Sequence, residues 1–402
     1  MPPATIPSKR GAWFAPSSKV TGRASPTRLK SSRSVGRTSS RKNGWPNSKP
    51  SWKTRRGRFP SPSPPARRGH RAASRRHHPE AGNRSRSARG RGGGGAPLVA
   101  ALTLAITGGT GFVGRHLIDL AVERGHRVRA LTRKAQPPRH GVEWIEGNLE
   151  DREALGRLVI DSDAVIHVAG VINAPDAAGF EAGNVTGTLA MLAAATAAGT
   201  HRFVHVSSLA AREPRLSQYG ASKARSEELV EGSGLDWVIV RPPAVYGPGD
   251  RETLELFKMA RRGIVYMPPK GRLSVIQVDD LARLLLAACD PDAPSKIIVE
   301  PDDGRPGGWS HIEFGHALGR AVGVKTGVVS TPRALLSVAS GIDRLFRRDK
   351  AKLTPDRVAY FCHPDWVVSS DRPVPANLWR PEISTEKGLA ETARWYQRQG
   401  WL

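Results

Sequence analysis

The fold is indicated by the stretch Leu102-Thr-Leu-Ala-Ile-Thr-Gly-Gly-Thr-Gly-Phe-Val-Gly114, an apolar run that leads directly into a glycine-rich turn. The apolar run predicts a buried strand, and the spacing of apolar residues from Phe112 to Arg124 predicts a helix. Glycines in such a turn permit a tight bend, close approach of a ligand to the backbone, and close packing of helix on strand. With the free N–H groups of the helix start, they predict a site for the pyrophosphate of a dinucleotide. The predicted contacts are Thr107, Gly108, Gly111, Phe112, Val113 and Gly114.

Strand and helix patterns continue to alternate after this turn. Apolar runs predict strands at 127–131, 142–145, 164–168, 203–206 and 237–240. Helical spacing predicts helices at 152–159, 187–198, 219–231 and 251–262. Such alternation is typical of a parallel sheet covered by helices on both faces. The sequence therefore predicts an α/β fold with a doubly wound parallel sheet of the Rossmann type.

Three regions are expected along the chain. Residues 98–290 are predicted to form the dinucleotide-binding domain, and residues 291–402 a smaller C-terminal lobe over the substrate, joined by about 247–272. Ligands of open α/β sheets bind at the carboxyl ends of the strands, which is where this lobe should lie. Its apolar and aromatic residues suit a core with an apolar pocket, so an aliphatic substrate such as a sterol or lipid is one hypothesis.

Residues 1–97 are predicted to be a disordered basic tail. They hold 24 of the 62 Lys and Arg residues and one of the 36 acidic residues, which leaves a net charge of only +3 for the rest. Three interpretations stay open: an upstream start-site artefact, an Arg- and Ser-rich transit peptide, and an arm that binds nucleic acid. With two cysteines and no apolar run long enough to span a membrane, the expected compartment is the cytoplasm, or an organelle if the tail is a transit peptide.

The end of the second predicted strand bears on the choice of dinucleotide. An acidic residue there would accept hydrogen bonds from a ribose 2′-hydroxyl, whereas a basic residue would meet a 2′-phosphate. Arg133, followed by Lys134, stands at this point. The expected cofactor is therefore NADP or NAD, with NADP favoured.

Ser208, Tyr219 and Lys223 form a second set of chemically active residues. Tyr219 and Lys223 are four positions apart on a predicted helix and so share one face. A cation beside a phenol favours the phenolate and lowers its pKa, which suits a general acid/base. Ser208, at a predicted strand end, can donate to the substrate oxygen. The histidines lack metal-ligand spacing, and no metal site is expected.

With these motifs, the chain resembles the extended short-chain dehydrogenase/reductase family, the branch of NAD-dependent epimerases, dehydratases and 3β-hydroxysteroid-dehydrogenase-like enzymes. The resemblance rests on the glycine turn, the Ser-Tyr-Lys set, and three further segments: His167-Val-Ala-Gly170, Asn184-Val-Thr-Gly187 and Arg241-Pro-Pro-Ala-Val-Tyr-Gly-Pro-Gly-Asp250. It covers roughly residues 98–402.

The resemblance implies a role for each matching residue. Tyr219 would be the general acid/base, Lys223 its pKa tuner and ribose anchor, and Ser208 the residue that orients the reacting oxygen. Asn184 would hold a water in a proton relay. The remaining implied cofactor contacts are Asn148 and Leu149 at the adenine, Val168, Ala169 and Gly170 at the adenine and ribose, and Pro243 and Val245 at the nicotinamide.

The expected activity is that of an NAD(P)-dependent dehydrogenase or reductase acting on a hydroxyl or carbonyl carbon of a small molecule. A second hypothesis is an epimerase or dehydratase that retains its cofactor, although Ser208 and Tyr219 are closer in sequence than in sugar-nucleotide epimerases. Two further hypotheses are a non-catalytic dinucleotide sensor and a nucleic-acid-binding protein that uses residues 1–97. The resemblance also suggests a homodimer.

Overall fold

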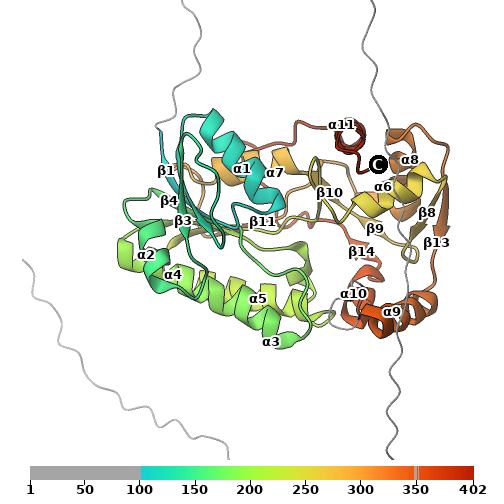
Figure 1. Cartoon of the computed structure of the whole chain (residues 1–402), viewed down its shortest axis with the longest axis horizontal. Coiled ribbons are helices and arrows are strands. Elements are labelled where there is room, and N and C mark those ends of the chain that lie inside the picture. The colour runs from blue at the N-terminus through green and yellow to red at the C-terminus, as the bar shows by residue number, and fades with distance from the viewer. Residues whose placement is uncertain (1–100, 348–350, 352) are drawn as a thin grey trace, which may run out of the picture. The chain divides into compact units, whose positions relative to one another are not determined.

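The computed structural model describes residues 101–347, 351 and 353–402. The predictions for residues 1–97 lie outside the described residues. Seven strands form one sheet in which every neighbouring pair is parallel (Figure 1). Their order is β11 (Ile297–Val299), β6 (Asp236–Val240), β5 (Arg202–Val206), β4 (Ala164–His167), β1 (Thr103–Thr107), β2 (Arg127–Thr132) and β3 (Val142–Glu146). The predicted doubly wound Rossmann sheet is confirmed.

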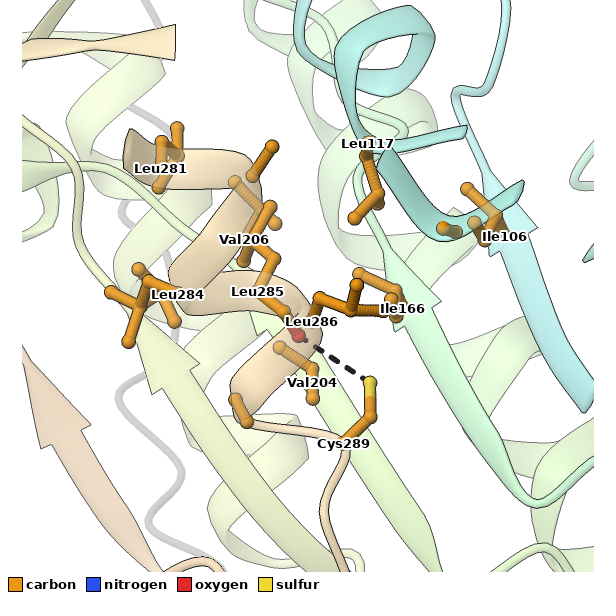
Figure 2. Close-up of a cluster of buried hydrophobic side chains, with 14 of the residues drawn as sticks. Ile106, Leu117, Ile166, Val204, Val206, Leu281, Leu284, Leu285, Leu286 and Cys289 are labelled. Carbon is orange, nitrogen blue, oxygen red and sulfur yellow. Dashed lines mark hydrogen bonds between the residues drawn. The ribbon is translucent and has the colours of Figure 1, made fainter. Parts of the chain in front are cut away.

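Helices cover both faces of this sheet. On one face, α1 (Phe112–Glu123) and α7 (Val278–Ala287) pack their apolar side chains into one core cluster with β1, β4 and β5. Figure 2 shows Leu285 and Leu286 of α7 beside Ile166, Val204 and Val206. On the other face, α2 (Arg152–Val159), α4 (Gly187–Ala198) and α5 (Gln218–Glu231) contribute to a second cluster. Both faces of the sheet are therefore buried, as continuous apolar strands require.

Predicted and observed bounds agree closely in this half. The helices at 152–159 and 187–198 have the predicted bounds, and the predicted strands differ by one residue at either end. The helix expected from residue 251 begins at Leu254 instead, after an Asp250 carboxylate that accepts hydrogen bonds from two following N–H groups. Strand β11 lies beyond residue 290, so the sheet extends past the expected boundary, and the division into two domains stays a prediction.

The segments after β6 gather around a third core cluster. It contains Tyr246, Phe257, Phe314 and Tyr396, with all four largely shielded from solvent. The helices of this region are α6 (Leu254–Arg261), α8 (His311–Ala321), α9 (Arg333–Arg347), α10 (Pro355–Phe361) and α11 (Thr385–Arg398). Its strands are β7 (Ala244–Tyr246), β8 (Ile264–Met267), β9 (Arg272–Leu273), β10 (Val275–Gln277), β12 (Trp309–Ser310), β13 (Gly327–Ser330) and β14 (Asp365–Trp366).

Buried polar contacts tie the C-terminal segment to the sheet. The Asp280 carboxylate on α7 is 1% exposed and accepts hydrogen bonds from the N–H groups of Glu382 and Ile383 at 3.1 and 3.0 Å. The indole of Trp379 donates to the Asp280 carbonyl at 2.9 Å. Within the described part of the chain, no helix is both long and apolar enough to cross a bilayer.

Candidate active site

A cavity of about 1890 Å³ lies at the carboxyl ends of the neighbouring strands β1 and β4. After these two strands, the chain continues to opposite faces of the sheet. This switch point is where open α/β sheets bind dinucleotides. The cavity exceeds the roughly 300–1,000 Å³ of a drug-sized site, so it has room for a dinucleotide and a second molecule. Most of the predicted site residues line it: Gly108, Gly111, Phe112, Val113, Gly114, Arg133, Asn148, Leu149, Val168, Ala169, Gly170, Ser208, Tyr219, Pro243 and Val245.

The glycine turn forms one wall of the cavity and has no room for side chains. Gly108 adopts φ +71°, and a Cβ there would lie 2.7 Å from the Ala169 nitrogen. A Cβ on Gly114 would collide with the Gly108 carbonyl oxygen. Gly111 is the N-cap of α1, and no side chain caps this helix start. The free N–H groups and the helix dipole therefore suit an anionic group such as a pyrophosphate.

A buried hydrogen-bond network fixes the neighbouring strand ends. The Thr107 hydroxyl lies 2.8 Å from His167 Nδ1 and accepts a hydrogen bond from the Ala169 N–H at 3.1 Å. His167 Nε2 lies 3.1 Å from the Thr188 hydroxyl. Burial lowers the pKa of His167 to about 3, with a smaller contribution from Lys223, so the ring is neutral. Thr107, fully buried, thus supports the cavity wall.

Residues expected at the adenosine end are at the rim. Arg133 is exposed, lines the cavity, and forms no ion pair with any described residue. Asn148 Oδ1 accepts a hydrogen bond from the Glu150 N–H at 2.7 Å, which shapes the turn after β3. Leu149 packs against Gly187, where a Cβ would lie 2.6 Å from its Cδ1. A free cation at the rim is available to a phosphate.

Ser208 and Tyr219 meet at the floor of the cavity. Ser208 follows β5 and caps the 3₁₀ turn η2 (Leu209–Arg212), while Tyr219 lies in the first turn of α5. Burial raises the pKa of Tyr219, and a hydrogen bond with the Ser208 side chain and the positive charge of Arg357 oppose this shift. The phenol is therefore protonated in this structure and is ready to donate a proton.

Lys223 and Asn184 are buried beside the cavity, next to Gly170. A Cβ on Gly170 would lie 3.1 Å from both Lys223 Nζ and Asn184 Oδ1. Lys223 Nζ donates to the Val206 carbonyl at 2.9 Å, and burial lowers its pKa to about 8 despite the nearby Glu227. No contribution of Lys223 to the pKa of Tyr219 is resolved, so its tuning role stays a prediction.

Asn184 lies in a π-helical turn, η1 (Glu181–Thr186), that the sequence did not predict. Its side-chain amide donates to the Val171 carbonyl and to the Ser222 hydroxyl, both at 2.9 Å, and its Oδ1 accepts from the Val171 N–H at 2.6 Å. These contacts anchor the loop after β4 to α5. The predicted water relay through Asn184 is untested.

A buried ion network holds α5 against the sheet. Arg241, after β6, donates to both carboxylate oxygens of Glu227 on α5 at 2.9 and 2.6 Å and contacts Glu300 at 3.3 Å. Glu227 and Glu300 are 3% exposed each, and Glu300 accepts a hydrogen bond from the Ser369 N–H at 2.8 Å. The Arg241-Pro-Pro segment, which resembled a family motif, thus fixes the helix that carries Tyr219.

The sequence marked Tyr360 and Phe361 of α10 only as core or pocket residues of the lobe, and it did not identify Asp356 or Arg357. Arg357 and Tyr360 line the cavity, and the ring of Tyr360 packs on that of Trp366 at 4.6 Å between centroids, with the planes tilted by 34°. The Gln218 N–H, one residue before Tyr219, donates to the Asp356 carboxylate at 2.7 Å. Gln218 and Asp356 are 138 positions apart in the sequence, and no local pattern predicts a contact over that separation.

Comparisons with known proteins identify the family of this chain. The sequence model of the NAD dependent epimerase/dehydratase family matches residues 104–299. A ceramide reductase of Caulobacter vibrioides is 37% identical, with 74% of this chain and 96% of that protein covered. A 2-alkyl-3-oxoalkanoate reductase of Stenotrophomonas maltophilia is 29% identical over 72% of this chain and 97% of that protein.

A likeness to solved structures supports the same fold. The structure of MoeE5 in complex with UDP-glucuronic acid and NAD has a TM-score of 0.57 at 20% identity, covering 74% of this chain and all of that one. Identity at this level establishes the fold and no more. The nearly complete coverage of the ceramide reductase, together with the family match, shows the relationship. The chain is an enzyme of the NAD dependent epimerase/dehydratase family.

Proposed function

We propose that this protein is an NAD(P)-dependent reductase that converts a ketone on a long aliphatic molecule to a secondary alcohol, or catalyses the reverse oxidation. The observation that supports it most directly is the pairing of Ser208 and Tyr219 at the floor of the cavity. A protonated phenol held by a hydroxyl is the arrangement needed to donate a proton to a carbonyl oxygen.

Each residue has a defined task in this proposal. When bound, a reduced nicotinamide supplies the hydride that forms the new C–H bond. Ser208 donates a hydrogen bond to the carbonyl oxygen and orients it, and Tyr219 passes its phenolic proton to that oxygen as the C=O double bond becomes a single bond. Lys223, one helical turn away, stabilises the resulting phenolate. Proximity and orientation of these groups contribute much of the rate enhancement.

The aliphatic substrate is suggested by the cavity wall opposite the glycine turn. This wall is formed by α6, β8, α9, α10, β14 and the segment just before α10. Its apolar lining residues are Leu256, Met259, Met267, Leu336, Leu353, Phe361 and Trp366. Apolar surface binds alkyl chains in proportion to the area removed from water. The two reductases covered over almost their full length, named for a ceramide and a 2-alkyl-3-oxoalkanoate, support the same substrate class.

We further propose that NADP is preferred over NAD, through Arg133. Its guanidinium group at the rim would pair with a 2′-phosphate. In the Arg133→Ala variant, we expect the Kd for NADP to rise about tenfold or more and the Kd for NAD to stay within about twofold, as measured by tryptophan fluorescence titration. An unchanged ratio of the two constants would rule out this assignment.

The main test is an assay of ketones with increasing alkyl chain length against NADPH and NADH, followed by the absorbance of the reduced ring. We expect kcat/KM to rise with chain length and to fall about 10²–10⁴-fold in Tyr219→Phe. Cofactor affinity should stay unchanged in this variant, because the aromatic ring is kept. The proposal is wrong if Tyr219→Phe retains full turnover, or if only sugar nucleotides react without net redox change.

A further inference from the structure

The exposed apolar residues of this protein gather in one region. Twelve large apolar side chains are exposed among the described residues, and eight of them lie on β8, β13 and α9. They are Ile264, Tyr266, Val329, Leu335, Val338, Ile342, Leu345 and Phe346, with exposures of 45% to 80%. We call this set the apolar face. Exposed apolar side chains that cluster in this way mark an interaction surface.

On α9, these residues form a regular stripe. Leu335, Val338, Ile342 and Leu345 follow one another at spacings of three and four, so they share one side of the helix. Leu336 and Ser340 lie on another side, where Leu336 lines the cavity and Ser340 is buried. The helix thus turns one side to the substrate cavity and its apolar stripe to solvent.

The strand pair β8 and β13 extends this surface toward the cavity mouth. Ile264 and Tyr266 alternate outward on β8, and Val329 pairs with Tyr266 in register. Tyr266 is 55% exposed and also lines the cavity. Figure 1 shows β8 and β13 at the same end of the molecule as α9 and α10. The apolar face is therefore continuous with the entrance to the proposed substrate site.

Positive charge accompanies the apolar face. The stretches 261–270 and 320–347 carry eight Arg and Lys residues against a single acid, Asp343. Seven of these cations are exposed: Arg261, Arg262, Lys270, Arg320, Lys325, Arg333 and Arg347. A second copy of this face would bring like charges together, whereas a lipid surface with anionic headgroups would neutralise them.

We propose that the apolar face docks onto an anionic lipid bilayer, with α9 lying in the plane of the interface. Its 15 residues span about 22 Å, which suits a helix that lies in the surface rather than one that crosses it. Leu345 and Phe346 enter the acyl region, and the cations contact headgroups. If the proposed function holds, an aliphatic substrate passes from the bilayer along Tyr266 into the cavity.

The test uses the full chain with vesicles of phosphatidylcholine alone and of phosphatidylcholine mixed with phosphatidylglycerol. Hydrogen exchange is read locally, because residues 1–97, with 24 Lys and Arg residues, are expected to attract anionic lipid in every variant and to dominate a bulk assay. We expect residues 333–347 to gain protection only with the mixed vesicles. High salt should leave residual protection, since apolar insertion persists when charge is screened.

A variant pair connects this protection to the apolar face. Leu345→Ser with Phe346→Ser removes the two most exposed members, and we expect vesicle partition at high salt to fall about tenfold. Ile160→Ser with Leu189→Ser is the matched control, because both residues are 53% exposed and lie on α4 or at the end of α2. The control should bind as the unmodified protein does.

Three outcomes would overturn the docking proposal. Residues 333–347 could stay unprotected with mixed vesicles, both double variants could lose partition equally, or protection could rise with protein concentration without lipid, which would indicate a second copy. Turnover of a short water-soluble ketone separates this proposal from the proposed function. If that ketone is reduced while docking is absent, only the docking proposal fails; if docking occurs without any ketone reduction, only the proposed function fails.

Discussion

The cofactor side and the substrate side of the cavity are built on different principles. Around the glycine turn, polar groups such as Thr107, His167 and Asn184 are buried and paired, and a side chain on Gly108 or Gly114 would clash with backbone atoms. Across the cavity, α9 and α10 contribute the apolar side chains of Leu336 and Phe361, which are half-buried. A fully packed site accepts one ligand geometry, whereas a loosely covered apolar wall can accept a flexible chain.

The strongest test of this contrast is to break the ion network behind α5. In Glu227→Gln, Arg241 loses its bidentate partner in a buried position, and we expect the free energy of unfolding to fall by about 3 kcal/mol. Thermal and urea unfolding followed by circular dichroism would measure it. Arg157→Gln, which removes an exposed ion pair with Glu153, is the control and should cost less than about 0.5 kcal/mol. Equal losses of unfolding free energy in the two variants would contradict the tight packing described for the cofactor side.

A second test adds one methyl group to the glycine turn. Gly114→Ala forces a Cβ against the Gly108 carbonyl, and we expect a loss of about 1–3 kcal/mol in stability and at least tenfold weaker binding of NADP. Gly156→Ala is the matched control, because a Cβ in that helix meets no atom within 4 Å. It should stabilise the fold by up to about 1 kcal/mol. Calorimetry and fluorescence titration of both variants would show whether only the turn is intolerant.

On the substrate side, a substitution of Arg357 should change the pH dependence of kcat/KM rather than the free energy of unfolding. The charge of Arg357 on α10 lowers the pKa of Tyr219 against the larger effect of burial, so in Arg357→Gln that pKa rises further. As a proton donor, Tyr219 loses activity when it deprotonates, and the alkaline limb of kcat/KM for ketone reduction should therefore move to higher pH. Arg357→Lys keeps the charge and should keep the profile. A shift toward lower pH would contradict the assignment.

The smallest effect on stability is expected for a substitution of His116 on α1. Burial lowers its pKa, but hydrogen bonds with Asp279 and the Pro248 carbonyl outweigh this and raise it above 6.5. A raised pKa means that the folded state holds the proton more tightly, so this stabilisation is present below pH 6.5 and is lost as pH rises through the folded pKa. The Tm difference between the unmodified protein and His116→Gln should shrink across that range. A difference that grows with pH would refute the charged pair.

Local sequence patterns predicted the sheet and its covering helices well. The strand and helix bounds and the position of the glycine turn follow from periodicity and spacing within about twenty residues, whereas the roles of Ser208 and Tyr219 stay predictions. The substrate side could not be predicted in this way, because Arg357 and Tyr360 are more than 130 positions from Tyr219 in the sequence. The π-helical turn at Asn184 was also missed, since no residue pattern distinguishes it from an α-helix. Strand β11 is only three residues long, too short to give a periodic signal.

The buried contacts of Asp280 and Glu300 join segments that are far apart in the sequence, so they affect the order in which the fold is completed. The Asp280 carboxylate pairs with Arg283 and also accepts hydrogen bonds from the N–H groups of Glu382 and Ile383. Glu300 pairs with Arg241 and also accepts a hydrogen bond from the Ser369 N–H. The backbone N–H partners lie 69 to 103 positions later in the chain than the two carboxylates. These buried contacts therefore form only after the later segment has been synthesised. We expect a variant truncated before residue 382 to be less stable, because the buried Asp280 carboxylate would then lack two of its hydrogen-bond partners.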